Sequence, residues 1–321
     1  MEIGLSAAGT WSTMRGTMVS GNYGQPEILM RKLLPCLFTA ATLLSVSASA
    51  ADKKIILIAG KPSHGPGEHE FRAGCLLLQK CLSGVPGLTV EVCENGWPKD
   101  ASEFDGAAAV VLYADGGSGH PYFQADHAQV MEKLARQGVG LGFLHYAVEV
   151  PKGPASERMW EWIGGYYEDH YSCNPMWAPD YQAFPNHPIT RGVQPFSVKD
   201  EWYFNMRWRP DTNGLVYILV AKPSDAVRDG PYVWPSGPYP HIQADKGREE
   251  AMMWAYELEN GGRGFGWTGG HHHKNWGNDN YRKVVLNAIL WLAKVEVPPN
   301  GLESSITADD LARNLDQKGR K

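Results

Sequence analysis

The sequence predicts an α/β protein built around a mostly parallel sheet, and three observations lead to this prediction. Short apolar runs rich in β-branched residues recur along the chain, as in strands buried on both faces. Stretches with helical spacing of apolar residues separate several of them. Residues 151–240 are rich in Pro and Trp, which predicts long ordered loops. Strands that alternate with helices usually pair in parallel, so the expected class is a flavodoxin-like sheet with helices on both faces and long loop insertions.

The first half of the chain supplies the clearest elements. The run KIILIA at 54–59 predicts a buried strand, and the spacing of apolar residues predicts a helix over 69–82. Residues 88–93 alternate in polarity and predict a second strand, and AAAVVLY at 107–113 predicts a third. A helix over 124–136 and a fourth strand over 138–144 complete this half.

The second half is less regular. Further strands are expected at 215–221, 251–257 and 264–267. An amphipathic helix over 279–294 closes the domain, with Val284, Ile289 and Leu292 on its apolar side.

The N-terminus carries the features of an export signal. A basic Met30-Arg31-Lys32 precedes the apolar segment 33–46 and the small residues 47–50, so residues 30–50 are predicted to be a signal peptide. Residues 1–29 are interpreted as an over-extended gene start. Residues 51–296 then form one domain and 297–321 a polar C-terminal tail. We expect an exported protein, periplasmic or extracellular, that does not stay in the membrane after cleavage.

Composition and motifs exclude several functions. The net charge of −5 gives no basic surface for nucleic acid. No dinucleotide or phosphate-binding glycine motif occurs, so no nucleotide cofactor is expected. The oligomeric state stays open, a homo-oligomer included. Cys75 and Cys81 are too far apart on one helix to pair; either could bridge to Cys93, or all the cysteines could be free.

Ligands of open α/β sheets bind beyond the carboxyl ends of the strands, and three loops here carry histidines at such ends. His64 and His69 follow the first strand, His145 follows the fourth, and His271 follows the last core strand. His64, His145 and His271 are predicted metal ligands, whereas His69 could be functional or merely open a helix. His272 and His273 are expected to be exposed or hydrogen-bonded locally. Secondary histidine candidates are His120, His170 and His187.

A divalent metal, with zinc favoured, is the predicted cofactor. Imidazoles with a carboxylate form a common zinc ligand set, and Glu201 offers the carboxylate. His145, Glu201 and His271 are the predicted catalytic residues. The histidines match no compact motif such as H-E-x-x-H, so the prediction depends on the three loops meeting in space.

Aromatic residues in polar loops are candidates for sugar binding, because their ring faces suit sugar rings. Tyr203 and the loop tryptophans are predicted to contact a small carbohydrate, and Arg263 to fix a loop or meet an anionic group. The tryptophans are Trp177, Trp202, Trp234 and Trp276.

These residues resemble the ThuA-like family, named for trehalose utilisation. The resemblance covers nearly all of 53–294 and rests on the segments 63–70, 140–145, 164–170, 187–192, 200–203, 262–265 with 269–271, and 287–291. It implies a class I glutamine amidotransferase-like fold in which His145 holds the position of the amidotransferase cysteine. It also implies a link to carbohydrate metabolism, often to 3-keto sugars. The chain is therefore not expected to be a cysteine-dependent amidotransferase.

The hypothesis is an exported, metal-assisted enzyme acting on sugars or keto-sugar derivatives, as an isomerase, lyase or hydrolase. The alternative is a non-catalytic sugar-binding module on a degenerate amidotransferase-like scaffold. A weaker third option is a scaffold of this kind that mediates protein contacts.

Overall fold

A computed structural model describes residues 52–319. The predicted gene-start segment 1–29 and signal peptide 30–50 lie outside the described residues. The main strands are β1 (Lys53–Ala59), β2 (Leu88–Cys93), β3 (Ala107–Tyr113), β4 (Gly140–Leu144), β11 (Leu215–Ala221), β12 (Glu250–Glu257) and β13 (Arg263–Trp267). The helices are α1 (Phe71–Leu82), α2 (His127–Arg136), α3 (Pro154–Ile163), α4 (Asp225–Arg228), α5 (Pro240–Ala244), α6 (Asp279–Leu292) and α7 (Ala308–Ala312).

The seven main strands form one sheet in the order β11-β12-β13-β4-β3-β1-β2. All pairings from β2 to β13 are parallel, while β12 pairs antiparallel with β13 and with β11. The parallel part has the flavodoxin strand order. The predicted fold class is therefore confirmed, with an antiparallel extension at one edge.

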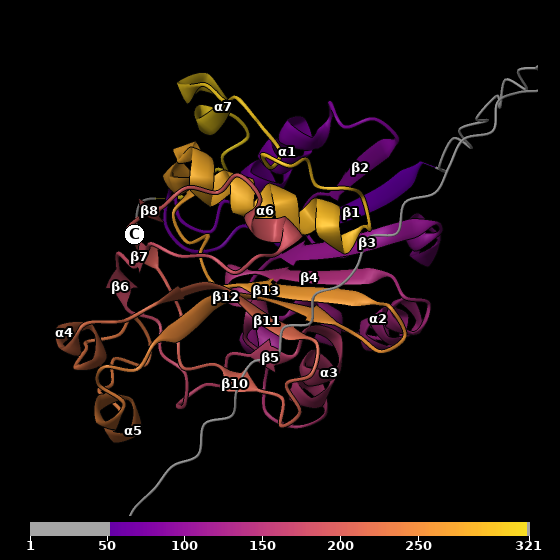
Figure 1. Ribbon diagram of the computed structural model, residues 1–321. Coiled ribbons are helices and arrows are strands. Elements are labelled where there is room, and N and C mark those ends of the chain that lie inside the picture. Colours follow the sequence, from indigo (N-terminus) through magenta and orange to yellow (C-terminus); the bar gives the residue numbers. More distant parts are fainter. Residues whose placement is uncertain (1–51, 320–321) are drawn as a thin grey trace, which may run out of the picture. The chain divides into compact units, whose positions relative to one another are not determined.

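Helices cover both faces of the sheet, as Figure 1 shows. Alternate residues of β1 point to opposite faces of the sheet and pack into different core clusters. Ile55 and Leu57 belong to the core cluster that includes α1 and α6, whereas Ile56 and Ile58 belong to the cluster with α2 and α3. The continuous apolar run of β1 therefore reflects burial on both faces.

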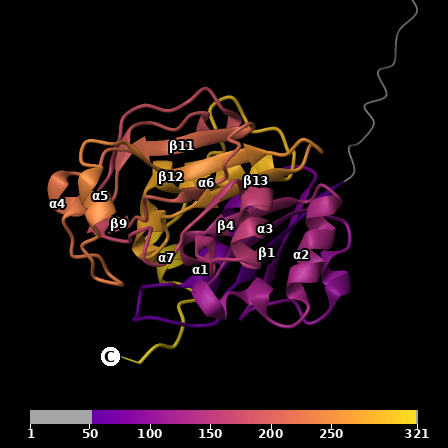
Figure 2. The same ribbon diagram turned by 90° about the horizontal axis from the view of Figure 1, so that it is seen from below.

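The Pro- and Trp-rich segment forms short two-stranded pairings instead of regular layers. They are β5 (Gly165–Tyr166) with β10 (Arg207–Trp208), β6 (Met176–Trp177) with β9 (Asp200–Glu201), and β7 (Asp180–Tyr181) with β8 (Phe196–Ser197). Helices α4 and α5 project from the side of the molecule away from α2 (Figures 1 and 2).

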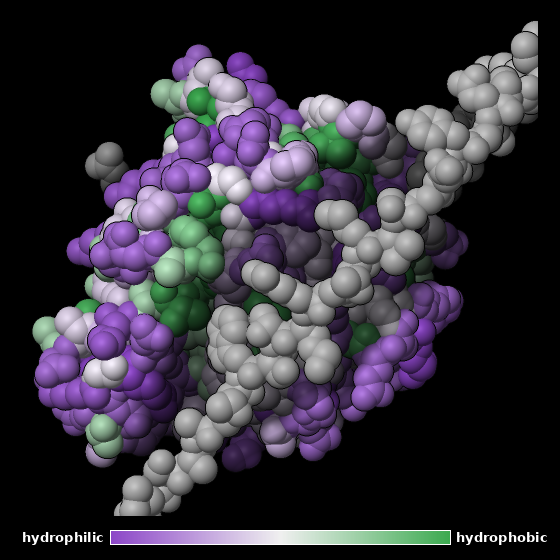
Figure 3. Space-filling model, viewed as in Figure 1, coloured by the Kyte–Doolittle hydropathy of each residue, from purple (hydrophilic) through white to green (hydrophobic). Residues whose placement is uncertain are grey.

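The described surface is largely hydrophilic on the face seen in Figure 3. No helix within residues 52–319 is long and apolar enough to cross a membrane. Cys75, Cys81, Cys93 and Cys173 are free thiols, so the free-cysteine alternative holds for this part of the chain.

Candidate metal centre and cavity

His145 stands at the end of the central strand β4. Every residue of that strand is buried, and His145 follows it with a left-handed backbone, φ 54°. This sharp turn aims the ring back over the sheet edge. Its Nδ1 lies 2.9 Å from the carbonyl oxygen of Thr268, which can only accept a hydrogen bond, so the proton is on Nδ1 and the lone pair on Nε2.

His69 reaches the same point from the loop between β1 and α1. Its backbone is also left-handed, φ 46°, and its N–H donates to the carbonyl of His271 at 2.9 Å. The ring is buried, and its Nδ1 lies 3.0 Å from Oδ1 of Asp115. Because Asp115 accepts this proton, the Nε2 of His69 also presents a lone pair.

Four ligand atoms converge here. Nε2 of His69 lies 3.0 Å from Nε2 of His145 and 3.0 Å from Nδ1 of His271. Oε2 of Glu201 lies 2.6 Å from Nδ1 of His271 and 3.6 Å from Nε2 of His145. Tetrahedral zinc with nitrogen ligands separates the ligand atoms by about 3.3 Å. The four residues are all buried, and their ligand atoms lie within 4.8 Å of one another.

Asp200 positions two of these four residues. This fully buried carboxylate precedes Glu201 on β9 and accepts hydrogen bonds from Gly270 N (2.9 Å) and His272 N (3.1 Å). His271 lies between those two residues. The hydroxyl of Tyr281 donates to the same carboxylate at 2.5 Å. Asp200 thus fixes the loop of His271 against the strand of Glu201.

The electrostatics favour neutral imidazoles at two of the three positions. Burial, together with the neighbouring histidines, holds the pKa values of His69 and His145 well below the usual range. Burial opposes charge on His271 as well, but the hydrogen bond and charge of Glu201 outweigh it and raise the pKa of His271. Burial raises the pKa of Glu201. Two neutral rings therefore face each other with lone pairs 3.0 Å apart, an arrangement that a cation between them would stabilise.

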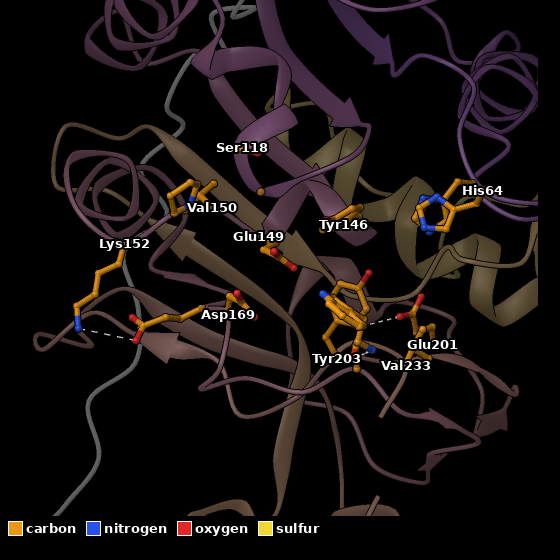
Figure 4. Close-up of a pocket in the computed structure, with 16 residues that line it drawn as sticks. His64, Ser118, Tyr146, Glu149, Val150, Lys152, Asp169, Glu201, Tyr203 and Val233 are labelled. Atoms are coloured by element: carbon orange, nitrogen blue, oxygen red, sulfur yellow. Dashed lines mark hydrogen bonds and ion pairs between the residues drawn. The ribbon is translucent and has the colours of Figure 1, made fainter. Parts of the chain in front are cut away.

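A cavity of about 660 Å³ opens beside this cluster. His69, Glu201 and Tyr203 line its inner end, and the Tyr203 hydroxyl lies 3.2 Å from Nε2 of His145. Figure 4 shows Glu149 between this inner end and the outer end, where Lys152 and Asp169 lie. The cavity therefore extends from the four ligand residues along a wall of polar side chains.

Glu149 lines the same cavity and has a strongly raised pKa. Burial and the nearby carboxylates of Asp169 and Glu201 raise the pKa of Glu149 to about 8. The side chain is therefore largely a neutral carboxylic acid at pH 7, able to donate a proton to a bound ligand. No pattern in the sequence singles it out, since it lies five residues beyond β4 in a loop.

We expect Glu149→Gln to change how stability depends on pH. Below pH 4.5 the carboxyl is protonated in both the folded and unfolded states. Between pH 4.5 and 8 only the unfolded chain releases the proton, so the wild type loses stability as pH rises, by about 2–4 kcal/mol. In urea unfolding, the free energy of unfolding of Glu149→Gln should rise relative to that of the wild type from pH 5 to pH 8. Glu157→Gln, at an exposed glutamate, is the control. A constant difference between wild type and variant would refute the raised pKa.

The structure brings together most of the predicted catalytic residues, with one replacement. His145, Glu201 and His271 meet as expected, but His69 takes the position predicted for His64. The His64 ring stacks on His69, with ring centroids 3.5 Å apart, and its Nδ1 hydrogen-bonds Ser63. His64 shares a second, more exposed group of ligand atoms with His69 and Asp115.

The sugar-platform prediction is wrong for three tryptophans. Trp202 and Trp276 are fully buried, and Trp177 is 6% exposed with its Nε1 donating to the carbonyl of Trp202. They pack in the core between the sheet and the loops, so they offer no ring face to a ligand. Trp234, in contrast, is 77% exposed and lines the cavity with Tyr203.

Arg263 makes contacts within the fold, as one of its expected roles allowed, but it does not lie where it could bind substrate, and His273 is buried against expectation. Arg263 begins β13, so it lies at the end of the sheet opposite the cluster, where it bonds the carbonyl of Trp291 and pairs with Glu257. His273 is only 3% exposed. His272, which is partly buried, donates its N–H to Asp200, a residue distant in the sequence, so this hydrogen bond is not the local one expected.

The other histidines have structural positions. His120 is buried and bonds the carbonyl of Ala147, and the half-buried His187 accepts from Ile189 N. His170 is exposed beside Asp169.

The C-terminal tail has a role that its composition does not predict. The side chain of Lys318 is buried, with its Nζ against the carbonyls of Glu68 and His69 and 3.3 Å from the carboxylate of Glu70. The backbone N–H of Asp316 donates to that carboxylate at 2.8 Å. The tail therefore holds the loop that carries His69, and is not simply a free polar extension.

A known protein family matches most of this chain. The family model for ThuA, trehalose utilisation, matches residues 61–292. The chain belongs to the ThuA family, and this membership indicates a carbohydrate-related role.

One solved structure shares the fold, and two others show more distant similarities. A putative ThuA-like protein from Bacteroides uniformis is 15% identical, with a TM-score of 0.52 over 76% of this chain and 93% of that one. A putative ThuA-like protein from Parabacteroides merdae is 16% identical, with a TM-score of 0.49 over 80% and 94%. The glutaminase domain of a Trypanosoma brucei CTPS is 10% identical, with a TM-score of 0.41 over 78% and 100%. The comparison with curated proteins finds no match.

Proposed function

We propose that this chain is an exported, metal-assisted enzyme that carries out proton-transfer chemistry on a sugar or keto-sugar derivative. One observation supports this most: the ligand atoms of His69, His145, His271 and Glu201 converge beside a cavity. The family membership supports a carbohydrate as the ligand. Export rests on the sequence of residues 30–50.

The groups behind the cluster fit a metal centre. Metal-bound histidines usually donate their outer N–H to a carboxylate or a carbonyl. Here Asp115 and the carbonyl of Thr268 accept from His69 and His145, and Glu68 lies 3.7 Å from Nε2 of His271. Three imidazoles and one carboxylate form a donor set suited to zinc. Zinc would polarise a sugar oxygen or lower the pKa of a bound water.

The chain's own residues would orient the sugar and move the proton. Tyr203 presents its hydroxyl at the inner end of the cavity, beside His145. Glu149 holds a proton near neutral pH and lies along the same cavity, so it can protonate a leaving or newly formed oxygen. These roles suit an isomerase, a lyase or a hydrolase.

Metal content and turnover on the purified chain test this proposal. We expect about one zinc per chain, and turnover of at least one of trehalose, maltose and their 3-keto derivatives that chelation abolishes and zinc restores. His145→Ala should lose both properties, whereas the exposed His170→Ala should keep them. Turnover that survives complete metal removal would contradict the metal role, and sugar binding without turnover would favour the binding-module alternative.

A further inference from the structure

An exposed hydrophobic pair lines the cavity, and Figure 4 shows one member, Val233, beside Tyr203 and Glu201. Trp234 is 77% exposed and Val233 45%, and the other large hydrophobic side chains exposed within residues 52–319 are Tyr217 and Leu315. Tryptophan is usually well buried in folded proteins. An indole left in water beside a cavity is therefore a typical feature of a ligand-binding surface.

One residue, Asn174, connects this pair by hydrogen bonds to the cluster of His69, His145, His271 and Glu201. The backbone N–H groups of Val233 and Trp234 donate to Asn174, to its carbonyl at 3.3 Å and to its side-chain Oδ1 at 3.2 Å. The Nδ2 of Asn174 donates in turn to Oε1 of Glu201 at 2.8 Å. Asn174 is only 8% exposed, so the backbone that carries Trp234 has a fixed position relative to the cluster.

The size of the cavity exceeds what a single sugar ring requires. Pockets for drug-sized ligands range over about 300–1,000 Å³, and this cavity has about 660 Å³. Glu201, Tyr203 and Trp234 all line it, and Lys152 and Asp169 offer further hydrogen-bond partners on its wall. A two-ring ligand could then reach the cluster with one ring and the indole with the other.

We propose that Trp234 is the stacking platform for the second ring of a glycoside whose first ring lies beside Glu201 and the histidines. The ligand class is thus a disaccharide, or a glycoside with a ring-sized aglycone, and not a free monosaccharide. The inference rests on the proposed function for the inner end of the cavity.

Calorimetry on the zinc-loaded chain tests the platform, with glucose as the one-ring probe and trehalose, maltose and cellobiose as the two-ring probes. At least one disaccharide should bind more tightly than glucose. Trp234→Ala should lower the affinity for that disaccharide by about tenfold, the loss expected from one aromatic contact and its buried area. The affinity for glucose should stay unchanged. Trp234→Phe should retain most of the affinity. Tyr217→Ala is the matched control, because it removes another exposed aromatic ring.

The results separate this inference from the proposed function. Zinc content and glucose binding report on the inner end, while the difference between one-ring and two-ring probes reports on the platform. A chain that binds zinc and glucose but no disaccharide more tightly overturns the platform alone. Equal loss of glucose and disaccharide binding in Trp234→Ala, or no loss of either, also overturns it. If the chain holds no zinc but still binds a disaccharide more tightly than glucose, the metal role is overturned and the platform role of Trp234 is supported.

Discussion

His69→Ala should lower the zinc affinity of the chain by roughly 10²–10³-fold. A structural zinc site contributes about 10–16 kcal/mol from four ligands, hence about 2.5–4 kcal/mol for each. His69 contributes the Nε2 that lies 3.0 Å from the donor atoms of both His145 and His271. No other His, Cys, Asp or Glu within 52–319 is grouped with those two and Glu201 at ligand distance.

His64→Ala is the matched control for this experiment. The two rings stack in the same loop, but His64 is exposed, and its ligand atoms are not grouped with those of His145, His271 and Glu201. Competition titration with a zinc-binding dye should show affinity within about threefold of the wild type for this variant, well below the 10–100-fold typical of residues that orient a ligand. If His64→Ala lost as much affinity as His69→Ala, the ligand set first expected from the sequence would be the correct one.

The second large effect is expected at Asp200. Asp200→Ala should reduce the free energy of unfolding by about 3–5 kcal/mol, because it leaves several buried donors without a partner. Those donors are Gly270 N, His272 N and the Tyr281 hydroxyl. Zinc affinity should fall too, since the loop of His271 loses its attachment to β9.

Urea unfolding of the metal-free chain measures the stability effect without a contribution from zinc. Asp180→Ala offers a comparison at an exposed aspartate of strand β7, where a change within about 0.5 kcal/mol is expected. A loss below 1 kcal/mol for Asp200→Ala would show that its hydrogen bonds do not hold this loop.

The fold and the place of the site could be predicted because they depend on local patterns. Continuous apolar runs such as 54–59 and 107–113 identified the buried parallel strands. The rule that ligands bind beyond the carboxyl ends of such strands then selected His145 and His271. Asp115 follows β3 by two residues, so the same rule would have selected it.

The choice between His64 and His69 could not be made from the sequence. Both lie in one loop, and the inward direction of His69 depends on its left-handed backbone and its hydrogen bond to the carbonyl of His271. That bond joins residues 202 positions apart. The contact of Lys318 with the same loop is equally remote and follows no periodic pattern.

The tryptophans were misjudged for a related reason. Trp202 and Trp276 are flanked by polar residues, which predicts exposure, yet each packs against Trp267 and Tyr281. Burial here comes from elements that meet only in the folded chain. A polar neighbourhood in the sequence therefore did not separate Trp276 from Trp234, which is exposed.

A crystal of the zinc-loaded chain, measured above and below the zinc absorption edge, tests the central claim most directly. We predict one strong anomalous peak among His69 Nε2, His145 Nε2, His271 Nδ1 and a Glu201 carboxylate oxygen, each at about 2.0–2.2 Å. An empty space between these four atoms, or a peak bound by His64 and Asp115 in their place, would contradict it.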